Sequence, residues 1–386
     1  MNYKKISELT TVVTGGTPST SVAEYWDNGT IPWLQSGCCQ NCDVDSTEKY
    51  ITQAGYDNSS TRIMPKDTVM IALTGATAGK IGYLTFEACG NQSITGILPC
   101  EFLNQRFLYY YLISQRSQIL ADCVGGAQTH ISQGYVKNIE IPLYSLEKQK
   151  QIVEVLDKIC SVLTDREQEL QKLDELVKAR FVEMFGDVRT GVYKFETRKL
   201  GDVAEVGSSH RVFTTEFVET GIPFYRGTEI GELASGIKPE NPYRITEEHY
   251  NRLACDETKP KIGDLLMPSI CNKGQVWMVD TEEPFYYKDG RVLCVSPNRE
   301  LFNCKFLEQF MREKTLVEYP KLGSGSTFAE FKIFLLKDID VIIPPIELQN
   351  QFAEFCKQLD KSKVVVQKEL ENAQELFDSL MQQYFG

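Results

Sequence analysis

The sequence predicts an α+β protein in which two pseudo-symmetric α/β modules are separated by two long antiparallel coiled-coil helices. Residues 141–186 return, at a constant offset, as residues 341–386. Both stretches carry apolar residues at the alternating four-three spacing of a heptad seam. Each stretch follows short runs of β-branched and aromatic residues that Gly, Pro, Asn and Asp interrupt, as expected of short strands. The chain is therefore a duplication.

The seam predicts that the two helices pack on each other. Its apolar positions in the first copy are Ile152, Leu156, Ile159, Leu163, Leu170, Leu173, Val177 and Met184. The matching positions of the second copy include Phe352, Cys356, Leu359, Val366, Leu370, Ala373, Phe377, Leu380 and Tyr384. Arg166, Arg180 and Lys363 are the polar seam residues. We expect them to set the register of the pair, although positions at the helix edge would also explain them.

Turn and cap signals bound these helices. Ser145 can cap the first helix, and Pro344 and Pro345 precede the second. Each helix ends at a Phe-Gly pair, and its length implies a span of roughly 55 to 60 Å. We expect module 1 at 1–144, the first helix at 145–186, module 2 at 187–345 and the second helix at 346–386.

Within the modules, matching motifs recur at an offset that drifts, so insertions and deletions concentrate there. Residues 5–9 resemble 199–203, and residues 29–33 resemble 220–224. Helical periodicity predicts helices over 106–120 and 305–319. The predicted strands are 10–14, 68–73, 80–85, 139–143, 264–267, 275–279, 291–296 and 339–343. Variable modules on helices of constant length suit recognition units mounted on a spacer.

Composition restricts the class of protein. The chain has 386 residues, of which 42% are hydrophobic and 24% charged, as in ordinary soluble proteins. No basic-apolar leader or membrane-length apolar run is visible, so we expect a cytoplasmic protein without a membrane partner. The 12 cysteines lack framework spacing and are expected to be reduced thiols. The net charge of −12 argues against non-specific coating of nucleic acid.

Motifs in the first half carry a family resemblance. Residues 125–134 read Gly-Gly-Ala-Gln-Thr-His-Ile-Ser-Gln-Gly and lead into residues 136–149. Together they resemble the end of a target recognition domain in the specificity subunit of type I restriction-modification enzymes. The family's other motifs follow its order at residues 15–19, 31–33, 79–82 and 91–92. The second half keeps Ile222-Pro223 and the helix entry at 344–349, but Phe-Ala-Glu-Phe at 328–331 replaces the His-Ile-Ser type of sequence.

The resemblance implies a non-catalytic, sequence-specific subunit that binds double-stranded DNA. Its two target recognition domains would read a bipartite site with a fixed unread spacer. It implies two modification (methyltransferase) subunits as partners, with restriction subunits joined through them. S-adenosylmethionine, ATP and Mg would be bound only by those partners, so we expect neither a cofactor nor a metal in this chain.

Base-reading residues should be polar side chains on loops, because amide and guanidinium groups pair with base edges. In module 1 the candidates are Gln35, Gln40, Asn41, Thr74, Lys80, Gln92, Gln128 and His130. In module 2 they are Arg211, Arg226, Asn272, Lys273, Arg291, Ser326 and Thr327. For any single candidate, a solvated loop position is the alternative.

Other functions leave weaker signals. Residues 75–81 look like a phosphate loop, but the spacing is one residue short and Ile81 stands where Ser or Thr is needed, so a tight turn is expected. The Cys39-x-x-Cys42 pair lacks a second pair for zinc. The enzyme alternative is a self-sufficient restriction or methylation enzyme; however, the only Pro-Pro lacks the flanking residues of an amino-methyltransferase motif. The structural alternative is a coiled-coil assembly scaffold that binds no DNA.

Overall fold

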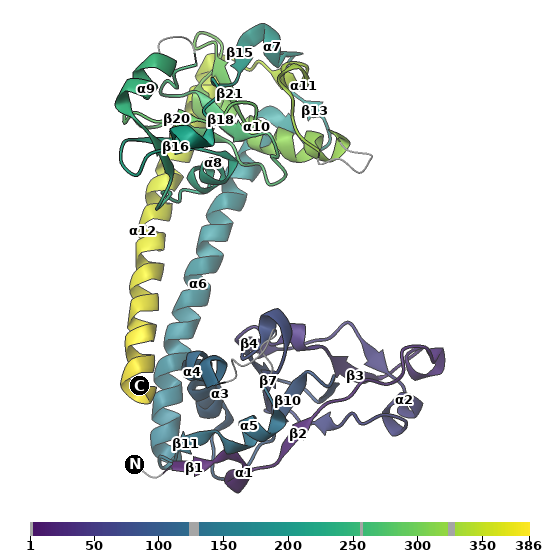
Figure 1. The fold of residues 1–386 in the computed structure, drawn as a ribbon. Helices are drawn as coiled ribbons and strands as arrows, with labels where there is room; N and C mark the ends of the chain where they lie inside the picture. Colours follow the sequence, from purple (N-terminus) through teal and green to yellow (C-terminus); the bar gives the residue numbers. More distant parts are fainter. Residues whose placement is uncertain (1–2, 123–130, 255–257, 323–328) are drawn as a thin grey trace. The chain divides into compact units, whose positions relative to one another are not determined.

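The computed structural model describes residues 3–122, 131–254, 258–322 and 329–386, and these residues form a mixed α and β fold (Figure 1). The chain divides into two compact units. Unit 1 comprises residues 1–168 and 367–386, and unit 2 comprises residues 169–366. Two helices of 40 residues, α6 (Leu146–Phe185) and α12 (Ile346–Phe385), contribute to both units.

Unit 1 is built on two sheets and several short helices. One sheet has the order β2 (Val12–Thr14), β10 (Ile94–Ile97), β7 (Val69–Ala72), β8 (Ile81–Leu84) and β4 (Cys42–Val44). The other has the order β5 (Tyr50–Ile51), β3 (Ile31–Leu34), β9 (Ala88–Gly90) and β6 (Ile63–Met64). A separate antiparallel pair joins β1 (Tyr3–Lys5) to β11 (Glu140–Pro142). The helices are α1 (Ile6–Leu9), α2 (Gln53–Asp57), α3 (Gln105–Ser114), α4 (Arg116–Asp122) and α5 (Gln133–Asn138).

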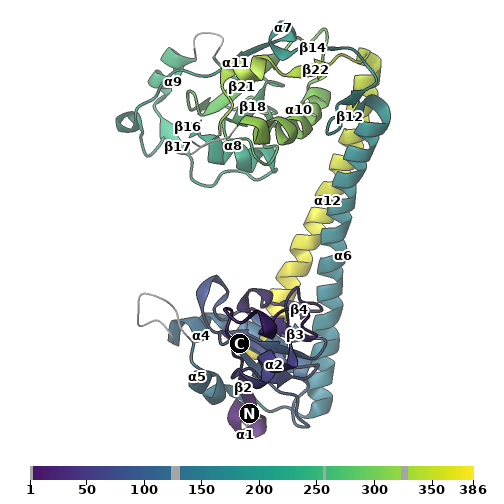
Figure 2. The same cartoon turned by 90° about the vertical axis from the view of Figure 1, so that its right-hand side faces the viewer.

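The core of unit 1 joins the module to both long helices. Phe107 of α3 and Leu156 of α6 are fully buried, and they share a core with Phe385 of α12. The rings of Phe107 and Phe385 lie 5.4 Å apart, edge to face. The first part of α6 therefore packs with the last part of α12, so the two helices run antiparallel, and Figure 2 shows them side by side.

Unit 2 repeats this organisation. Its larger sheet has the order β15 (Ala204–Gly207), β21 (Val292–Pro297), β18 (Leu265–Pro268) and β19 (Trp277–Met278). The second has the order β17 (Tyr243–Ile245), β16 (Ile222–Tyr225) and β20 (Tyr286–Tyr287). Two further antiparallel pairs join β12 (Gly186–Asp187) to β13 (Val192–Tyr193) and β14 (Thr197–Lys199) to β22 (Asp340–Ile342). The helices are α7 (Leu200–Val203), α8 (Gly227–Ala234), α9 (Glu247–Leu253), α10 (Cys304–Glu318) and α11 (Ile333–Lys337).

An aromatic cluster forms the centre of unit 2. Phe306 of α10 takes the place that Phe107 has in unit 1, and it stacks on Phe181 of α6 at 5.6 Å. Phe185 of α6 and Phe352 of α12 complete the cluster, and their ring centroids lie 5.6 Å apart. Because fully buried aromatic side chains contribute most to such a core, this cluster fixes α6 and α12 to the second module.

The seam positions of both long helices are buried or half-buried, whereas most positions between them are exposed. In unit 1, Arg166 of α6 pairs with Glu369 of α12 at 3.1 Å. In unit 2, Lys363 of α12 pairs with Asp174 of α6 at 2.6 Å. Arg180 pairs within its own helix, with Glu183 at 2.7 Å, and its guanidinium also lies 5.9 Å from the centre of the Phe355 ring of α12.

One fully buried glutamine attaches the start of each long helix to its module. The side chain of Gln149 accepts a hydrogen bond from the Asn104 N–H at 2.8 Å and donates to the carbonyls of Phe102 and Tyr144. In unit 2, Gln349 accepts from the Asn303 N–H at 2.9 Å and donates to two carbonyl groups. Asn104 and Asn303 in turn cap α3 and α10 through their own side chains. We call these two arrangements the glutamine clamps.

Each expected strand or helix is observed in type and position, with one exception, but the strands of the sheets β5-β3-β9-β6 and β17-β16-β20 were not among the predicted ones. The helix predicted over residues 106–120 is divided at Gln115 into α3 and α4. The Ser114 hydroxyl donates to the Tyr111 carbonyl at 2.7 Å. The same carbonyl also accepts the regular bond from the Gln115 N–H at 3.1 Å, so the Ser114 hydroxyl shares an acceptor with the helix where the helix divides. The apolar periodicity does not predict this division.

Two further properties concern the described part of the chain. It contains no helix that is long and apolar enough to cross a membrane. Its ten cysteines form no disulfide bonds with one another.

The first prediction tests the clamp. Replacing Gln149 with Leu leaves one amide and two carbonyl groups without their partners in a buried site, so we expect a loss of about 2–4 kcal/mol in unfolding free energy. Denaturant titration monitored by circular dichroism measures this. Gln151→Leu, at an exposed position of α6, is the matched control and should change stability little. Equal stability of the two variants would contradict the role of the clamp.

Candidate nucleic-acid interface

The sheet of unit 1 that contains β3 and β9 brings two polar segments together at one edge. These strands are parallel, so their carboxyl ends meet. Gln35 follows β3, and Asn91 and Gln92 follow β9. The Asn91 N–H donates to the Leu34 carbonyl at 2.9 Å, which holds the two strand ends together. The predicted readers Gln35 and Gln92 therefore lie at the same edge and line one cavity.

A glycine pair brings a second loop against this edge. The N–H groups of Gly15 and Gly16 donate to the carbonyls of Ile94 and Gly90. A Cβ atom at Gly15 would lie 2.0 Å from the Gly90 oxygen, so only glycine permits this approach. The loop then places Thr17 beside Gln92, and the Thr17 hydroxyl donates to the Gln92 amide oxygen at 2.5 Å.

Aromatic side chains also line this cavity, whose volume is about 740 Å³. Trp33 donates its indole N–H to the Gly16 carbonyl at 2.9 Å. Trp26 packs edge to face on Trp33 at 5.0 Å. The lining residues are Thr17, Thr20, Trp26, Asn28, Gly29, Trp33, Gln35, Glu48, Lys49, Tyr50, Asn91 and Gln92. Exposed amides beside aromatic walls can both hydrogen-bond to base edges and contact the thymine methyl group.

The other described candidates of module 1 are already engaged within the protein. Lys80 donates to the Gln40 amide oxygen at 2.5 Å, and Gln40 donates to the Gly37 carbonyl at 3.0 Å. Asn41 accepts from the Ile81 N–H, and Thr74 donates to the Ser93 hydroxyl. The segment before Lys80 is a tight turn between β7 and β8, with Gly75 and Gly79 at positive φ, as the sequence predicts.

Module 2 has a matching edge with different side chains. Strands β16 and β20 are parallel, and the Lys288 N–H donates to the Tyr225 carbonyl at 2.9 Å. Arg226 follows β16 as Gln35 follows β3. Its guanidinium pairs with Glu229 at 2.7 Å and lies 4.5 Å from the centre of the Tyr243 ring. Burial opposes ionisation of Glu229, but hydrogen bonds from Arg226 and from backbone N–H groups lower its pKa below the ordinary value.

The remaining described candidates of module 2 are exposed on loops or at strand ends. Arg291 pairs with Glu330 at 2.7 Å, and Lys332 contacts the same carboxylate. The hydrogen bond from Lys332, with the nearby charges, lowers the pKa of Glu330. Arg211 lies 5.3 Å from the Phe213 ring. Asn272 and Lys273 are exposed, and the Lys273 N–H donates to the Gln275 side chain.

Four candidates, Gln128, His130, Ser326 and Thr327, lie outside the described residues. Ile131 and Phe331, which come shortly after these candidates in the sequence, are among the described residues. The Ile131 N–H donates to the Leu73 carbonyl at 2.9 Å, and the Phe331 N–H donates to the Ser269 carbonyl at 2.7 Å.

Sequence reasoning did not select Thr17, Trp26, Tyr50 or Asn91 as site residues, although they line the cavity. For Thr17, a usable signal existed, because the Gly15-Gly16 pair implies a close backbone approach just before it.

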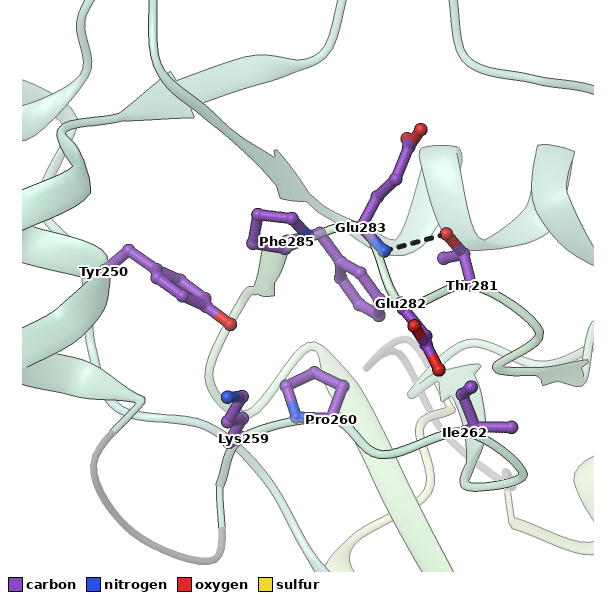
Figure 3. Close-up of a pocket in the computed structure, with 9 residues that line it drawn as sticks. Tyr250, Lys259, Pro260, Ile262, Thr281, Glu282, Glu283 and Phe285 are labelled. Carbon is purple, nitrogen blue, oxygen red and sulfur yellow. Dashed lines mark hydrogen bonds between the residues drawn. The ribbon is translucent and has the colours of Figure 1, made fainter.

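A smaller cavity, of about 200 Å³, lies in unit 2 (Figure 3). Lys259 and Tyr250 line it together with Glu282 and Glu283, and the Glu283 N–H donates to the Thr281 hydroxyl at 3.0 Å. None of its lining residues is a predicted base reader. Its two carboxylates make it a poor site for DNA phosphate.

Among the described residues, there is no group of three or more His, Cys, Asp or Glu side chains that could hold a metal ion. Cys39 of the Cys-x-x-Cys pair is fully buried, and Cys42 is exposed.

Comparison with known proteins identifies one relative over nearly the whole chain and another over about half of it. The specificity subunit of the MjaIX enzyme of Methanocaldococcus jannaschii is 24% identical over 404 residues, which cover 98% of this chain and 91% of that subunit. The EcoR124I/EcoR124II specificity subunit of Escherichia coli is 29% identical over 202 residues, which cover 51% of this chain and 50% of that subunit.

A solved structure shares the fold. The S subunit of a type I restriction-modification system from M. genitalium has a TM-score of 0.56 at 16% identity, covering 100% of this chain and 96% of that one. The family model described as "Type I restriction modification DNA specificity domain" matches residues 1–176 and 193–375. The chain therefore belongs to the type I restriction-modification specificity subunit family.

Proposed function

We propose that the chain is the non-catalytic subunit that gives a type I restriction-modification complex its DNA specificity, and that it reads a bipartite site. The observation that supports this most strongly is the matched pair of strand edges. Both modules place polar side chains after a parallel strand pair, but the residues differ, with Gln35 in module 1 and Arg226 in module 2. Different side chains at equivalent positions suit two different half-sites.

The long helices are proposed to set the unread spacer between the half-sites. The division into recognition domains at 1–144 and 187–345 and spacer helices at 145–186 and 346–386 belongs to this proposal. Both helices have 40 residues, their starts are held by matching clamps, and their seam positions recur at a constant offset. Helices of fixed length would hold the distance between the two half-sites constant.

Chemistry and much of the phosphate attraction are assigned to partner subunits. S-adenosylmethionine, ATP and Mg would be bound by methyltransferase and restriction subunits. The long helices carry exposed apolar side chains away from the seam, which suit protein docking. They are Leu146, Val155, Val162, Leu176 and Val182 on α6 and Val364, Val365 and Leu376 on α12. The net charge of −12 also favours a basic partner for DNA binding.

The second prediction concerns DNA selection. The complex purified through a tag on the full-length chain should enrich, from random duplexes, one sequence in two parts separated by a constant gap. Sequencing of the bound fraction measures this. Methyl transfer or DNA cleavage by the isolated chain would support the self-sufficient enzyme instead, and the absence of any enriched sequence would support the scaffold.

The third prediction concerns the spacer. Inserting one heptad into both long helices at matched positions keeps the seam in register and lengthens the pair by about 10 Å. The gap in the selected DNA should then grow by about three base pairs, while both half-sites stay the same. Replacing one heptad by another of equal length is the control. A changed half-site with an unchanged gap would refute the proposed spacer role.

A further inference from the structure

We infer that Arg226 reads a guanine in the major groove of the half-site of module 2, and that Glu229 and Tyr243 are positioning residues that hold its guanidinium in one orientation. The inference rests on the proposed function, since it assigns a base to one side chain of that interface.

The first step of the argument is which edge of the guanidinium Glu229 occupies. The Arg226 Nη2 atom donates to Glu229 Oε1 at 2.7 Å, and Nε lies 3.3 Å from both carboxylate oxygens. In the planar guanidinium, Nε and Nη2 form one edge, and Nη1 with the second N–H of Nη2 forms another. The contact with Glu229 therefore fixes the plane of the group and leaves the Nη1–Nη2 edge for a ligand.

The second step is that the carboxylate is itself held in place. Glu229 lies in the first turn of α8, is 6% exposed, and also accepts the backbone N–H of Arg226 at 2.9 Å. Exposed ion pairs contribute little, because two mobile side chains must be ordered to form them. A buried carboxylate that already binds the backbone is a more rigid anchor, so the guanidinium is held relative to β16.

An aromatic side chain restrains the same guanidinium from one face. Tyr243 of β17 pairs with Phe224 of β16, and its ring centre lies 4.5 Å from the Arg226 Cζ atom. The ring of Phe217 stacks on Tyr243 at 4.6 Å. The hydrogen bond to Glu229 and, to a smaller extent, Tyr243 raise the pKa of Arg226. The Arg226 side chain nevertheless remains 40% exposed, so its free edge is accessible.

The third step is the chemistry of recognition. The free edge presents two parallel donors and no acceptor. Guanine offers two acceptors, O6 and N7, in the major groove. Adenine offers N7 but sets its amino group against the second donor, thymine offers only O4, and cytosine presents a donor. Both N–H groups are therefore paired only with guanine, which should be favoured by roughly 5- to 150-fold.

The ion pair also distinguishes base reading from phosphate binding. A cation beside a carboxylate attracts phosphate weakly, because the pair has no net charge. Hydrogen bonding to a base edge depends on the geometry of the donors instead. The position of Glu229 beside Arg226 therefore favours the base-reading role.

The test is sequence selection from random duplexes by the tagged full-length chain in its complex, with wild type and variants compared. Arg226→Lys keeps a positive charge beside Glu229 but loses the pair of parallel donors. The guanine preference at one position of one half-site should fall by at least about fivefold. Glu229→Gln, which removes one acceptor oxygen, should weaken the preference at the same position. Circular dichroism checks that each variant is folded.

Tyr243 offers a conservative variant and a disruptive one. Tyr243→Ala removes the ring and should broaden the guanine position, because the guanidinium gains freedom to rotate. Tyr243→Phe keeps the ring and should retain the wild-type preference.

Arg198→Ala is the matched control. Arg198 belongs to the β14–β22 pair and forms an exposed ion pair with Glu196 at 3.1 Å. It lies outside the sheet that contains β16, so both half-sites should be unchanged.

The outcomes separate this inference from the proposed function. If the wild type selects a bipartite sequence and Arg226→Lys selects the same one, the assignment to Arg226 is wrong while the function stands. Equal weakening of binding to all duplexes would mark Arg226 as a phosphate contact and overturn the inference. If Tyr243→Ala and Tyr243→Phe behave alike, or Glu229→Gln keeps the full preference, that residue does not orient the guanidinium. If the wild type enriches no sequence, the proposed function itself fails.

Discussion

A single buried glutamine at the start of each long helix connects the helix to its module, and the rest of each unit is arranged around that connection. Gln149 and Gln349 are fully buried, and each satisfies one amide and two carbonyl groups that would otherwise have no partner. Because the groups that Gln149 pairs are only partly buried, losing all three bonds of its clamp is expected to cost about 2–4 kcal/mol. The clamp therefore specifies one docking geometry, and the surrounding aromatic cores supply most of the stabilisation.

The two clamps also explain where the duplicated chain has diverged. Residues near each clamp keep matching contacts, including the capping side chains of Asn104 and Asn303. The strand edges that follow β3 and β16 lie outside those contacts and carry unrelated side chains. A change there alters what is presented to solvent without leaving a buried group unpaired. The packing around the clamps thus accounts both for the matching contacts at the helix starts and for the different side chains at the strand edges.

Periodicity and turn chemistry predicted most of the fold because they are local properties. The heptad spacing located α6 and α12, and the alternation of β-branched runs with Gly and Pro located strands of the two larger sheets. It located none of the strands in the sheets that contain β3 and β16. The clamps could not be predicted, because a glutamine in the first turn of a helix reads as an ordinary exposed residue. The contact between Thr17 and Gln92 spans 75 positions of sequence and depends on the parallel pairing of β3 with β9.

The residue types of the candidate site were predictable from the sequence. Which of those side chains are paired within the protein was not. Loop amides and guanidinium groups were identifiable as a class, and Gln35 and Gln92 do share one cavity. The sequence did not show that Arg226 is held by Glu229, although their three-residue spacing is compatible with such a pair. Whether a polar side chain is free to bind DNA depends on neighbours that only folding brings near.

The central claim, that each module reads its own half-site independently, is tested most directly by exchanging one module. Residues 1–144 would be replaced by the corresponding module of a relative, and methylated bases would be mapped across a genome in cells that contain the partner subunits. The account predicts that one half of the methylated sequence changes while the other half and the gap between them are unchanged. A simultaneous change in both halves, or in neither, would contradict it.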